Sequence, residues 1–259
     1  IHDLEVESLS AQQVAERFSG FIVPEGTVAT FERQGGVLKV EDCVRAHGRL
    51  AEEAGGALWS HTRVQDIRET GEGVVVATER GDVVAQSVLL SPGPWAADFF
   101  PSMTGTLEIR RKPLLWFEAE QGAYSPETKS PVFLYEVPEG LIYGFPSMND
   151  GVVKVALHSG GRRYDRPEEL VRELDENDAH ILKEFVQKWM PQVNADNVIR
   201  GDICMYTMSA DEHFIVGKSP DHSRVWMAGG LSGHGFKFSS VLGESLAQWI
   251  DEGAPRLSL

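Results

Sequence analysis

The 259-residue sequence has only two cysteines, no long apolar run and little positive charge. Cys43 and Cys204 lie far apart, which argues against a disulfide framework or a metal cluster and favours a reducing, cytoplasmic location. No apolar run approaches the roughly 20 residues of a membrane span, and no secretory signal is recognisable. The 24 Lys and Arg against 39 Asp and Glu give a net charge of −15, which argues against binding to nucleic acid or an anionic membrane.

What is present is typical of a globular protein, with 42% hydrophobic and 24% charged residues. Helix-like and strand-like segments follow one another without repeats, which predicts a mixed α/β fold with two interleaved sheet domains. Helices are expected at Ser10–Phe18, Glu41–Ala54, Pro167–Leu174, Ala179–Met190 and Val241–Ile250. The first should have Ser10 as its N-cap. Cys43 and Val44 should face the core side of the second, with Cys43 a buried small hydrophobe.

Short apolar or alternating runs predict the strands. They are expected at Thr27–Phe31, Gly36–Val40, Ala57–Ile67, Gly73–Thr78, Val83–Ser91, Leu107–Glu120, Val132–Val137, Leu141–Phe145, Val152–His158, Val198–Met208, His213–Val216 and Arg224–Ala228. The three strands between Ala57 and Ser91 are separated by turn residues and should form a small antiparallel meander.

A glycine-rich turn, Leu231–Ser240, joins the strand Arg224–Ala228 to the last helix. Glycines there let the backbone approach a bulky group, and a helix N-terminus directs N–H groups at it. The turn is therefore either a cradle for an anionic or electron-rich cofactor or a tight loop without a ligand. Lys237 favours the cradle, because a cation at a helix N-terminus opposes the helix dipole and needs another reason to be there.

Three sequence blocks carry a resemblance to a known family: Cys204-Met-Tyr-Thr207, Asp211-Glu-His-Phe-Ile215 and Ser232-Gly-His-Gly-Phe-Lys-Phe238. The chain resembles the monomeric sarcosine oxidase and N-methyltryptophan oxidase family of flavoenzymes, within the D-amino-acid-oxidase superfamily. The likeness runs over essentially the whole chain. It implies FAD bound covalently through a cysteine, and oxidation of secondary N-methyl amino acids by O2 with release of hydrogen peroxide. It also implies a small amino-acid substrate and a monomer.

The resemblance assigns roles to individual residues. It implies that Cys204 carries the flavin, that Lys154 activates O2 and that Lys237 binds the substrate carboxylate. Tyr143, His158, Tyr206 and His234 are implied as further active-site groups. The resemblance also implies cofactor contacts at Val64, Gly93, Gly233, Gly235 and Phe236.

The residues themselves leave alternatives open at two of these positions. Cys204 lies in a strand, where most cysteines are buried and inert. A strand lysine such as Lys154 usually points to solvent, although a fixed cation beside the flavin would stabilise negative charge on reduced O2. His158 shares a strand face with Lys154, because side chains repeat every second residue.

The sequence departs from the family in lacking the strand and G-x-G-x-x-G turn that hold the FAD pyrophosphate. We therefore expect an internal fragment of such an oxidase, which by itself is inactive and binds FAD poorly or not at all. Residues 1–35 and 105–202 should form the substrate domain. Residues 36–104 and 203–259 should form the remainder of a Rossmann-like FAD-binding domain.

Two other functions stay open from the sequence. The same fold could pass electrons to a carrier instead of O2, which would make the protein an FAD-dependent dehydrogenase. Alternatively, the chain could be a catalytically silent fragment without bound FAD. The substrate, among sarcosine, N-methyltryptophan and related amines, is not identified by the sequence.

Overall fold

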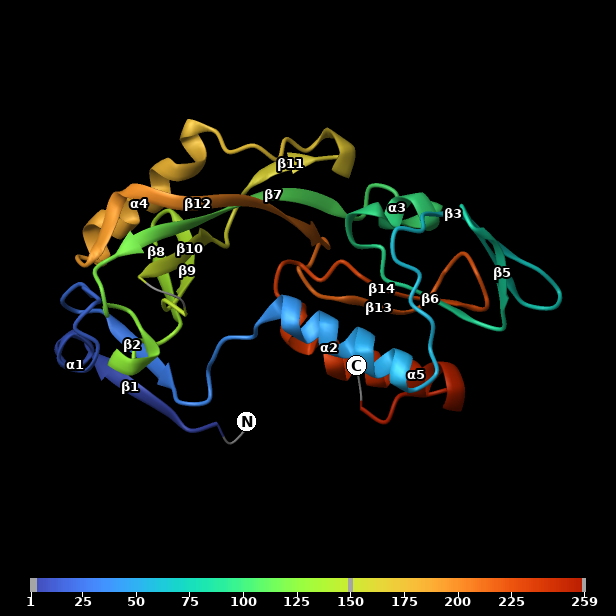
Figure 1. Cartoon of the computed structure of the whole chain (residues 1–259), viewed down its shortest axis with the longest axis horizontal. Coiled ribbons are helices and arrows are strands. Elements are labelled where there is room, and N and C mark those ends of the chain that lie inside the picture. The colour runs from blue at the N-terminus through green and yellow to red at the C-terminus, as the bar shows by residue number, and fades with distance from the viewer. Residues whose placement is uncertain (1–3, 149–150, 258–259) are drawn as a thin grey trace. The chain divides into compact units, whose positions relative to one another are not determined.

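The computed structural model describes residues 4–148 and 151–257 and divides the chain into two compact, interleaved units (Figure 1). The first unit combines the chain up to Val37 with Arg111–Arg162 and Val171–Cys204. The second combines Leu38–Arg110, Arg163–Leu170 and the chain from Met205 on. The expected mixed α/β fold is confirmed. The assignment of the units to substrate and FAD binding stays a prediction. Residues 105–110 and 163–170, expected with the first unit, cluster with the second.

The first unit is built on a six-stranded sheet with the strand order β11-β7-β10-β9-β8, in which β12 also pairs with β7. Its strands are β7 (Glu108–Ala119), β8 (Phe133–Val137), β9 (Gly140–Phe145), β10 (Val152–Leu157), β11 (Arg162–Tyr164) and β12 (Val193–Met208). Strand β10 pairs antiparallel with both β7 and β9, and β8 pairs antiparallel with β9. The two longest strands, β7 and β12, each extend into the second unit at one end.

One face of this sheet is covered by α4 (Glu176–Trp189). Alternate sheet residues such as Leu115, Phe117 and Val155 point into the core and are fully buried. On the helix, Leu182, Phe185 and Val186 are buried at helical spacing. The core of the first unit therefore lies between the sheet and α4.

A two-stranded sheet completes the first unit. Strands β1 (Val6–Ser10) and β2 (Val28–Glu32) pair antiparallel, and α1 (Ala11–Arg17) lies between them in sequence. Ser10 is the N-cap of α1, as predicted, and forms a reciprocal capping box with Gln13. Phe21, which follows α1, packs edge-on against Tyr124 with 5.3 Å between ring centroids.

The second unit contains two three-stranded sheets. Strands β3 (Val64–Glu69), β4 (Val74–Thr78) and β5 (Gly81–Ala85) form an antiparallel meander, and β13 (Ile215–Lys218), β14 (Val225–Gly229) and β6 (Val88–Leu90) form the other sheet. Its helices are α2 (Val40–Glu53), α3 (Ala96–Phe99) and α5 (Ser239–Glu252). Short 3₁₀ turns occupy Gly93–Trp95, Pro101–Met103, Pro167–Glu169 and Phe236–Phe238, and a further one, Pro126–Thr128, lies in the first unit. A compact apolar cluster that includes Val74, Phe100 and Met227 forms the core of the second unit.

Several expected elements differ from the structure. The run Val83–Ser91 is two strands, and the second, β6, leaves the meander to pair parallel with β14. Gly36–Val40 is not a strand, because this stretch leads into α2, whose N-cap is Lys39. Pro167–Leu174 contains only the 3₁₀ turn Pro167–Glu169, since Leu170 is extended.

The prediction for Cys43 and Val44 is wrong. All fourteen residues of α2 are described and none of them is buried. The side chain of Val44 is 57% exposed, and Cys43 is half-buried.

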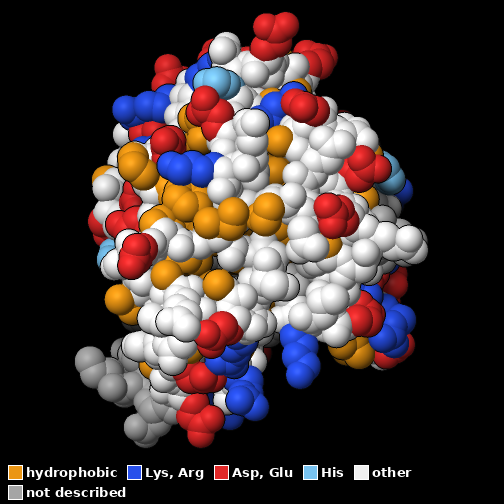
Figure 2. Space-filling view, turned by 90° about the vertical axis from the view of Figure 1, so that its left-hand side faces the viewer, with side chains coloured by type: hydrophobic (Ala, Val, Ile, Leu, Met, Phe, Trp, Pro, Cys, Tyr) orange, Lys and Arg blue, Asp and Glu red, His pale blue; other side chains and the backbone are white. Residues whose placement is uncertain are grey.

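The surface near α1 and α4 combines apolar and charged side chains. Figure 2 shows hydrophobic side chains gathered across the middle of one face, with Lys, Arg, Asp and Glu around them. Exposed apolar residues in the first unit include Ile22, Val28 and Leu134. No helix within residues 4–148 and 151–257 is long and apolar enough to cross a membrane.

Candidate active site

Three of the predicted site residues lie on the face of the first unit's sheet that points away from its core. Val153 and Val155 point into the core, so Lys154, between them on β10, points to the other face. On the neighbouring strand β9, Tyr143 is paired with Ala156 and Phe145 with Lys154. His158 directly follows β10, and its ring lies 6.3 Å from that of Tyr143. The sheet thus brings Tyr143, Lys154 and His158 together.

Aromatic rings surround the ammonium group of Lys154. Its Nζ lies 5.0 Å from the ring centroid of Trp116, its partner on β7, and 5.4 Å from that of Phe145. All three side chains are half-buried. A cation over an aromatic face is attracted by the negative face of the ring. Lys154 is therefore held on the sheet face by two rings.

A second cation reaches the same indole. The guanidinium carbon of Arg200, on β12, lies 4.6 Å from the ring centroid of Trp116. Arg200 also donates to Asp202 at 2.9 Å, and this hydrogen bond is the main reason that the pKa of Asp202 is below its ordinary value. Because side chains alternate along a strand, Cys204 lies on the face to which Arg200 points. Its thiol is exposed, so the alternative of a buried, inert cysteine is excluded.

A buried lysine, Lys112, holds the backbone of residues 158–160 in place. Lys112 is 1% exposed, and its Nζ donates to the carbonyl oxygens of His158 (2.5 Å), Ser159 (3.0 Å) and Gly160 (2.5 Å). These carbonyl oxygens accept hydrogen bonds from the Lys112 ammonium group. They replace the water that burial removes from it. The turn that carries His158 is therefore tied to β7.

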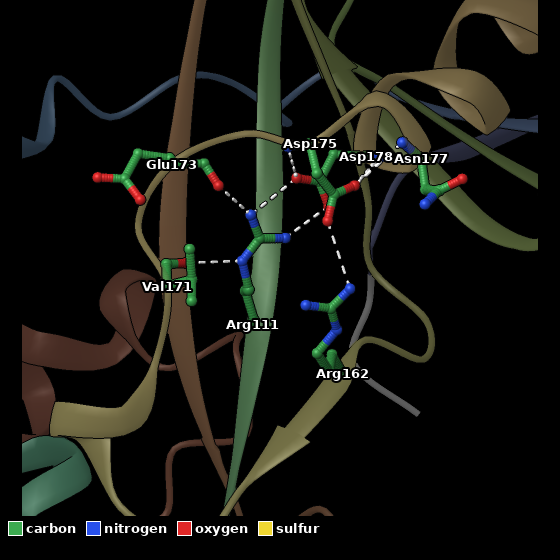
Figure 3. Close-up of polar contacts among 7 residues, drawn as sticks. All are labelled: Arg111, Arg162, Val171, Glu173, Asp175, Asn177 and Asp178. Carbon is green, nitrogen blue, oxygen red and sulfur yellow. Dashed lines mark hydrogen bonds and ion pairs between the residues drawn. The ribbon is translucent and has the colours of Figure 1, made fainter.

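The neighbouring residue, Arg111, makes the other buried clamp of the first unit (Figure 3). Its guanidinium donates to both carboxylate oxygens of Asp178, at 2.5 and 2.7 Å, and to the carbonyl oxygens of Val171 and Glu173. Burial alone would raise the pKa of Asp178, but the hydrogen bonds from Arg111 and from the Asp175 N–H hold it below the ordinary value. A cavity of about 260 Å³ beside this pair has Arg162 and Asp175 in its lining. Because the donors of Arg111 already serve protein acceptors, we assign this clamp to structure.

In the second unit, the glycine-rich turn is packed against Tyr206. Gly233 has a φ of +80°, and a Cβ at this position would overlap the Tyr206 ring. A Cβ at the buried Gly235 would come within 2.5 Å of Leu231. Ser232, with a φ of +48°, is fully buried and its N–H donates to the carbonyl of Thr207. Glycine is therefore required at positions 233 and 235 for the turn to close over β12.

The remaining predicted residues of this turn are accessible. Lys237 is exposed, Phe236 is half-buried, and the half-buried His234 ring lies 5.0 Å from that of Phe214. The Nδ1 of His234 lies 3.1 Å from the carbonyl oxygen of Ser232. In the described chain, α5 has no side-chain hydrogen bond at its N-cap, Phe238, and no acidic residue in its first turn. This unneutralised helix N-terminus, with an exposed cation beside it, fits an anionic or electron-rich group such as FAD or a carboxylate.

Two predicted cofactor positions lie elsewhere in the second unit. Val64 begins β3 and packs against the apolar cluster. Gly93, with a φ of +57°, lies in the turn after β6. The site residues thus form two groups, one in each unit. Their convergence in one active site stays a prediction, as do their individual roles.

Sequence reasoning overlooked four residues around the first group: Lys112, Trp116, Phe145 and Arg200. The run Arg110-Arg-Lys112 inside an apolar strand was the available signal, since cations in such a run need buried partners. For Trp116 and Arg200, the signal appears only once the strands are paired, because both are far in sequence from Lys154.

Relatives of this chain include sarcosine oxidases and N-methyltryptophan oxidases. The chain is 38% identical over 251 residues to monomeric sarcosine oxidase from Bacillus sp. (strain B-0618), covering 95% of this chain and 64% of that enzyme. It is 34% identical over 258 residues to N-methyl-L-tryptophan oxidase from Citrobacter koseri, covering 99% of this chain and 68% of that enzyme. The chain thus spans about two thirds of the length of these relatives.

Solved structures share the fold at low sequence identity. NikD, an unusual amino acid oxidase essential for nikkomycin biosynthesis, matches 98% of this chain and 67% of its own with a TM-score of 0.83 at 20% identity. L-proline dehydrogenase from P. horikoshii gives the same TM-score at 17% identity, with 98% and 67% covered. The family model described as FAD dependent oxidoreductase (DAO) matches residues 1–249. From the sheet, the glycine-rich turn and these matches together, the chain belongs to the DAO family of FAD-dependent oxidoreductases.

Proposed function

We propose that the protein to which this chain belongs is an oxidase of secondary N-methyl amino acids, such as sarcosine, that uses O2 and releases hydrogen peroxide. Family membership and the sarcosine oxidase relatives support the amino-acid oxidation. The observation that carries the use of O2 is the placement of Lys154, a cation held by two rings on the same sheet face as Tyr143 and His158.

FAD would be held by Cys204, through a thioether link to the flavin 8α-methyl carbon, and by the glycine-rich turn with Gly233, Gly235 and Phe236. Two observations support this fit: the thiol of Cys204 is exposed, and the N-terminus of α5 carries no acidic residue in its first turn. Val64 and Gly93 would contribute further contacts. When bound, FAD supplies the two-electron acceptor for oxidation of the substrate C–N bond.

The substrate would be oriented by its charged groups. Lys237 would bind the carboxylate, because an exposed ammonium beside a helix N-terminus offers both charge and N–H donors. Tyr143, His158, Tyr206 and His234 would line the amine and exchange hydrogen bonds with it. The buried clamp from Lys112 would keep His158 in place.

Lys154 would serve the second half of the reaction. Reduction of O2 builds negative charge on oxygen, and a fixed ammonium stabilises that charge without having to reorganise. The rings of Trp116 and Phe145 attract the ammonium group of Lys154 without removing its positive charge.

The test is to supply the whole protein with sarcosine, N-methyltryptophan and other N-methyl amino acids, and to measure O2 consumption and peroxide. Stoichiometric peroxide is expected, together with a flavin that stays with the denatured, precipitated wild-type protein and is released into solution from Cys204→Ala. Reduction of an artificial electron acceptor without O2 consumption would instead support the dehydrogenase. A protein without flavin absorbance would support the silent fragment.

We further propose a cytoplasmic monomer. The two cysteines are far apart in sequence, which suits a reducing compartment. The relative from Bacillus sp. is named as monomeric. Sedimentation of the purified protein and fractionation of the source cells test these two points.

A further inference from the structure

Trp116 stands out because two cations contact one indole. Lys154 reaches it from β10 with Nζ at 5.0 Å from the ring centroid, and Arg200 reaches it from β12 with its guanidinium carbon at 4.6 Å. Strand β7, which carries Trp116, pairs with both of these strands. The indole is thus placed between the two strands that present Lys154 and Cys204.

The contact with Trp116 restricts the side chain of Lys154. A lysine has four rotatable side-chain bonds, and on a half-exposed sheet face its ammonium would sample many rotamers. Trp116 and Phe145 are its direct cross-strand partners on the two sides, so their rings flank its side chain. Cation–aromatic attraction favours the rotamers in which Nζ lies over these rings.

Arg200 contributes to the same arrangement. Arg200 is exposed, and its guanidinium donates a hydrogen bond to the Asp202 carboxylate at 2.9 Å, which restricts the position of the guanidinium. Its contact with Trp116 therefore limits the freedom of the indole as well. A ring fixed in this way is a better platform for Lys154 than a ring that is free to turn.

We propose that Trp116 is a positioning residue, whose indole holds the ammonium of Lys154 at the place where the reduction of O2 needs a fixed positive charge. This inference rests on the proposed oxidase function. Trp116 touches neither substrate nor cofactor in this account and acts only through Lys154.

The first test reads the contact itself and needs no turnover. Lysines of the protein are reductively methylated with ¹³C-formaldehyde, and the Lys154 signal is assigned by its loss in Lys154→Arg. Nuclei above an indole face are shifted upfield, so this signal should lie upfield and should move downfield in Trp116→Leu, with the remaining upfield shift due to Phe145. Lys188, 4.5 Å from the ring centroid of Trp189, provides the matched control. Trp189→Leu should move the signal of Lys188 and leave that of Lys154 in place.

The second test reads the consequence. In the whole protein, Trp116→Leu should slow the reaction of the reduced enzyme with O2 about tenfold, or about 1.4 kcal/mol in the barrier. Reduction by substrate under anaerobic conditions should change by less than about twofold, and Trp116→Phe should retain most of the O2 rate. The double variant with Lys154→Met should be no slower than Lys154→Met alone.

The outcomes separate this inference from the proposed function. A Lys154 signal that does not move in Trp116→Leu overturns the inference, as does a Trp116→Leu effect that adds fully to that of Lys154→Met. If Lys154→Met itself leaves the O2 reaction unchanged, the proposed role of Lys154 fails, whatever the NMR shows. Trp116→Met, which keeps a large apolar side chain but has no ring, gives the same comparison if Trp116→Leu does not fold.

Discussion

Two helices of equal length, one in each unit, use their apolar side chains in different ways. In α4, Leu182 is 2% exposed and packs in the core of the first unit, whereas in α2 Leu50 is 53% exposed. Both sequences have helical periodicity, and both form helices of fourteen residues. Periodicity thus predicts that a helix forms and which side is apolar, but burial requires something to pack against that side.

The same contrast holds for ion pairs. Arg111 and Asp178 form a bidentate pair with side chains 3% and 9% exposed, and the pair ties α4 to β7. Arg45 and Asp42 form a pair on α2 with side chains 74% and 66% exposed. A buried charge without its partner is costly, whereas an exposed charge is solvated by water. The stability of the first unit should therefore depend far more on single residues.

The largest effect is expected from the buried pair. Asp178→Asn leaves the Arg111 guanidinium buried without its counter-ion and should lower the free energy of unfolding by about 3–5 kcal/mol. Asp42→Asn, the matched change in α2, should lower it by less than about 0.5 kcal/mol. Urea unfolding followed by circular dichroism measures both. Equal effects at the two positions would remove the distinction between the pairs.

Leucine truncation gives the next largest contrast. Leu182→Ala removes a fully packed side chain and should cost about 2–5 kcal/mol. Leu50→Ala removes an exposed one and should change stability by about 0.5 kcal/mol or less. The same urea experiment reports both values. A large cost for Leu50→Ala would show that α2 has a packing partner in the folded protein.

Alkaline pH should also affect the first unit selectively. Burial raises the pKa of Tyr124 to about 12 and raises that of Tyr135 as well, and both residues belong to the core of the first unit. The neutral forms are favoured in the folded state, so their stabilising contribution is complete below pH 10, the ordinary tyrosine value, and is lost as the pH rises toward 12. For Tyr124 this loss is on the order of 1 kcal/mol per pH unit between pH 10 and 12.

Urea titrations at pH 9, 10, 11 and 12 test this dependence. Tyr124→Phe cannot ionise, so its stability should fall less steeply above pH 10 than that of the wild type. It also loses the hydrogen bond from the Tyr124 hydroxyl to the carbonyl of Gly20, which should cost about 1 kcal/mol at neutral pH. Parallel curves for the two proteins would contradict the assignment to Tyr124.

Local signals in the sequence were sufficient for much of the fold. Ser10 and Gln13 form the capping box of α1, and the helix expected at Glu41–Ala54 is observed at Val40–Glu53. The helix expected at Pro167–Leu174 was wrong for a non-local reason. The carbonyl oxygens of Val171 and Glu173 accept from the Arg111 guanidinium, sixty residues away or more, and Leu170 is extended. Sequence periodicity contains no information about such a partner.

The candidate site shows the same limit. Alternation along one strand places Lys154 and His158 on one face without further information. Trp116, Phe145 and Arg200 join them only through strand pairing and register, which depend on the whole sheet. Lys112 was visible as part of a basic run, but its three carbonyl partners follow β10 and could not be inferred from β7 alone.

The proposed role of Lys154 is to provide the positive charge at which O2 is reduced. Lys154→Met keeps a long side chain and removes the charge, so folding and flavin attachment should survive. Stopped-flow measurement of the two half-reactions in the whole protein should show reaction with O2 slowed by at least about 10²-fold, on the order of 3 kcal/mol, with reduction by substrate changed far less. Equal slowing of both half-reactions, or no slowing of the reaction with O2, would contradict this role of Lys154.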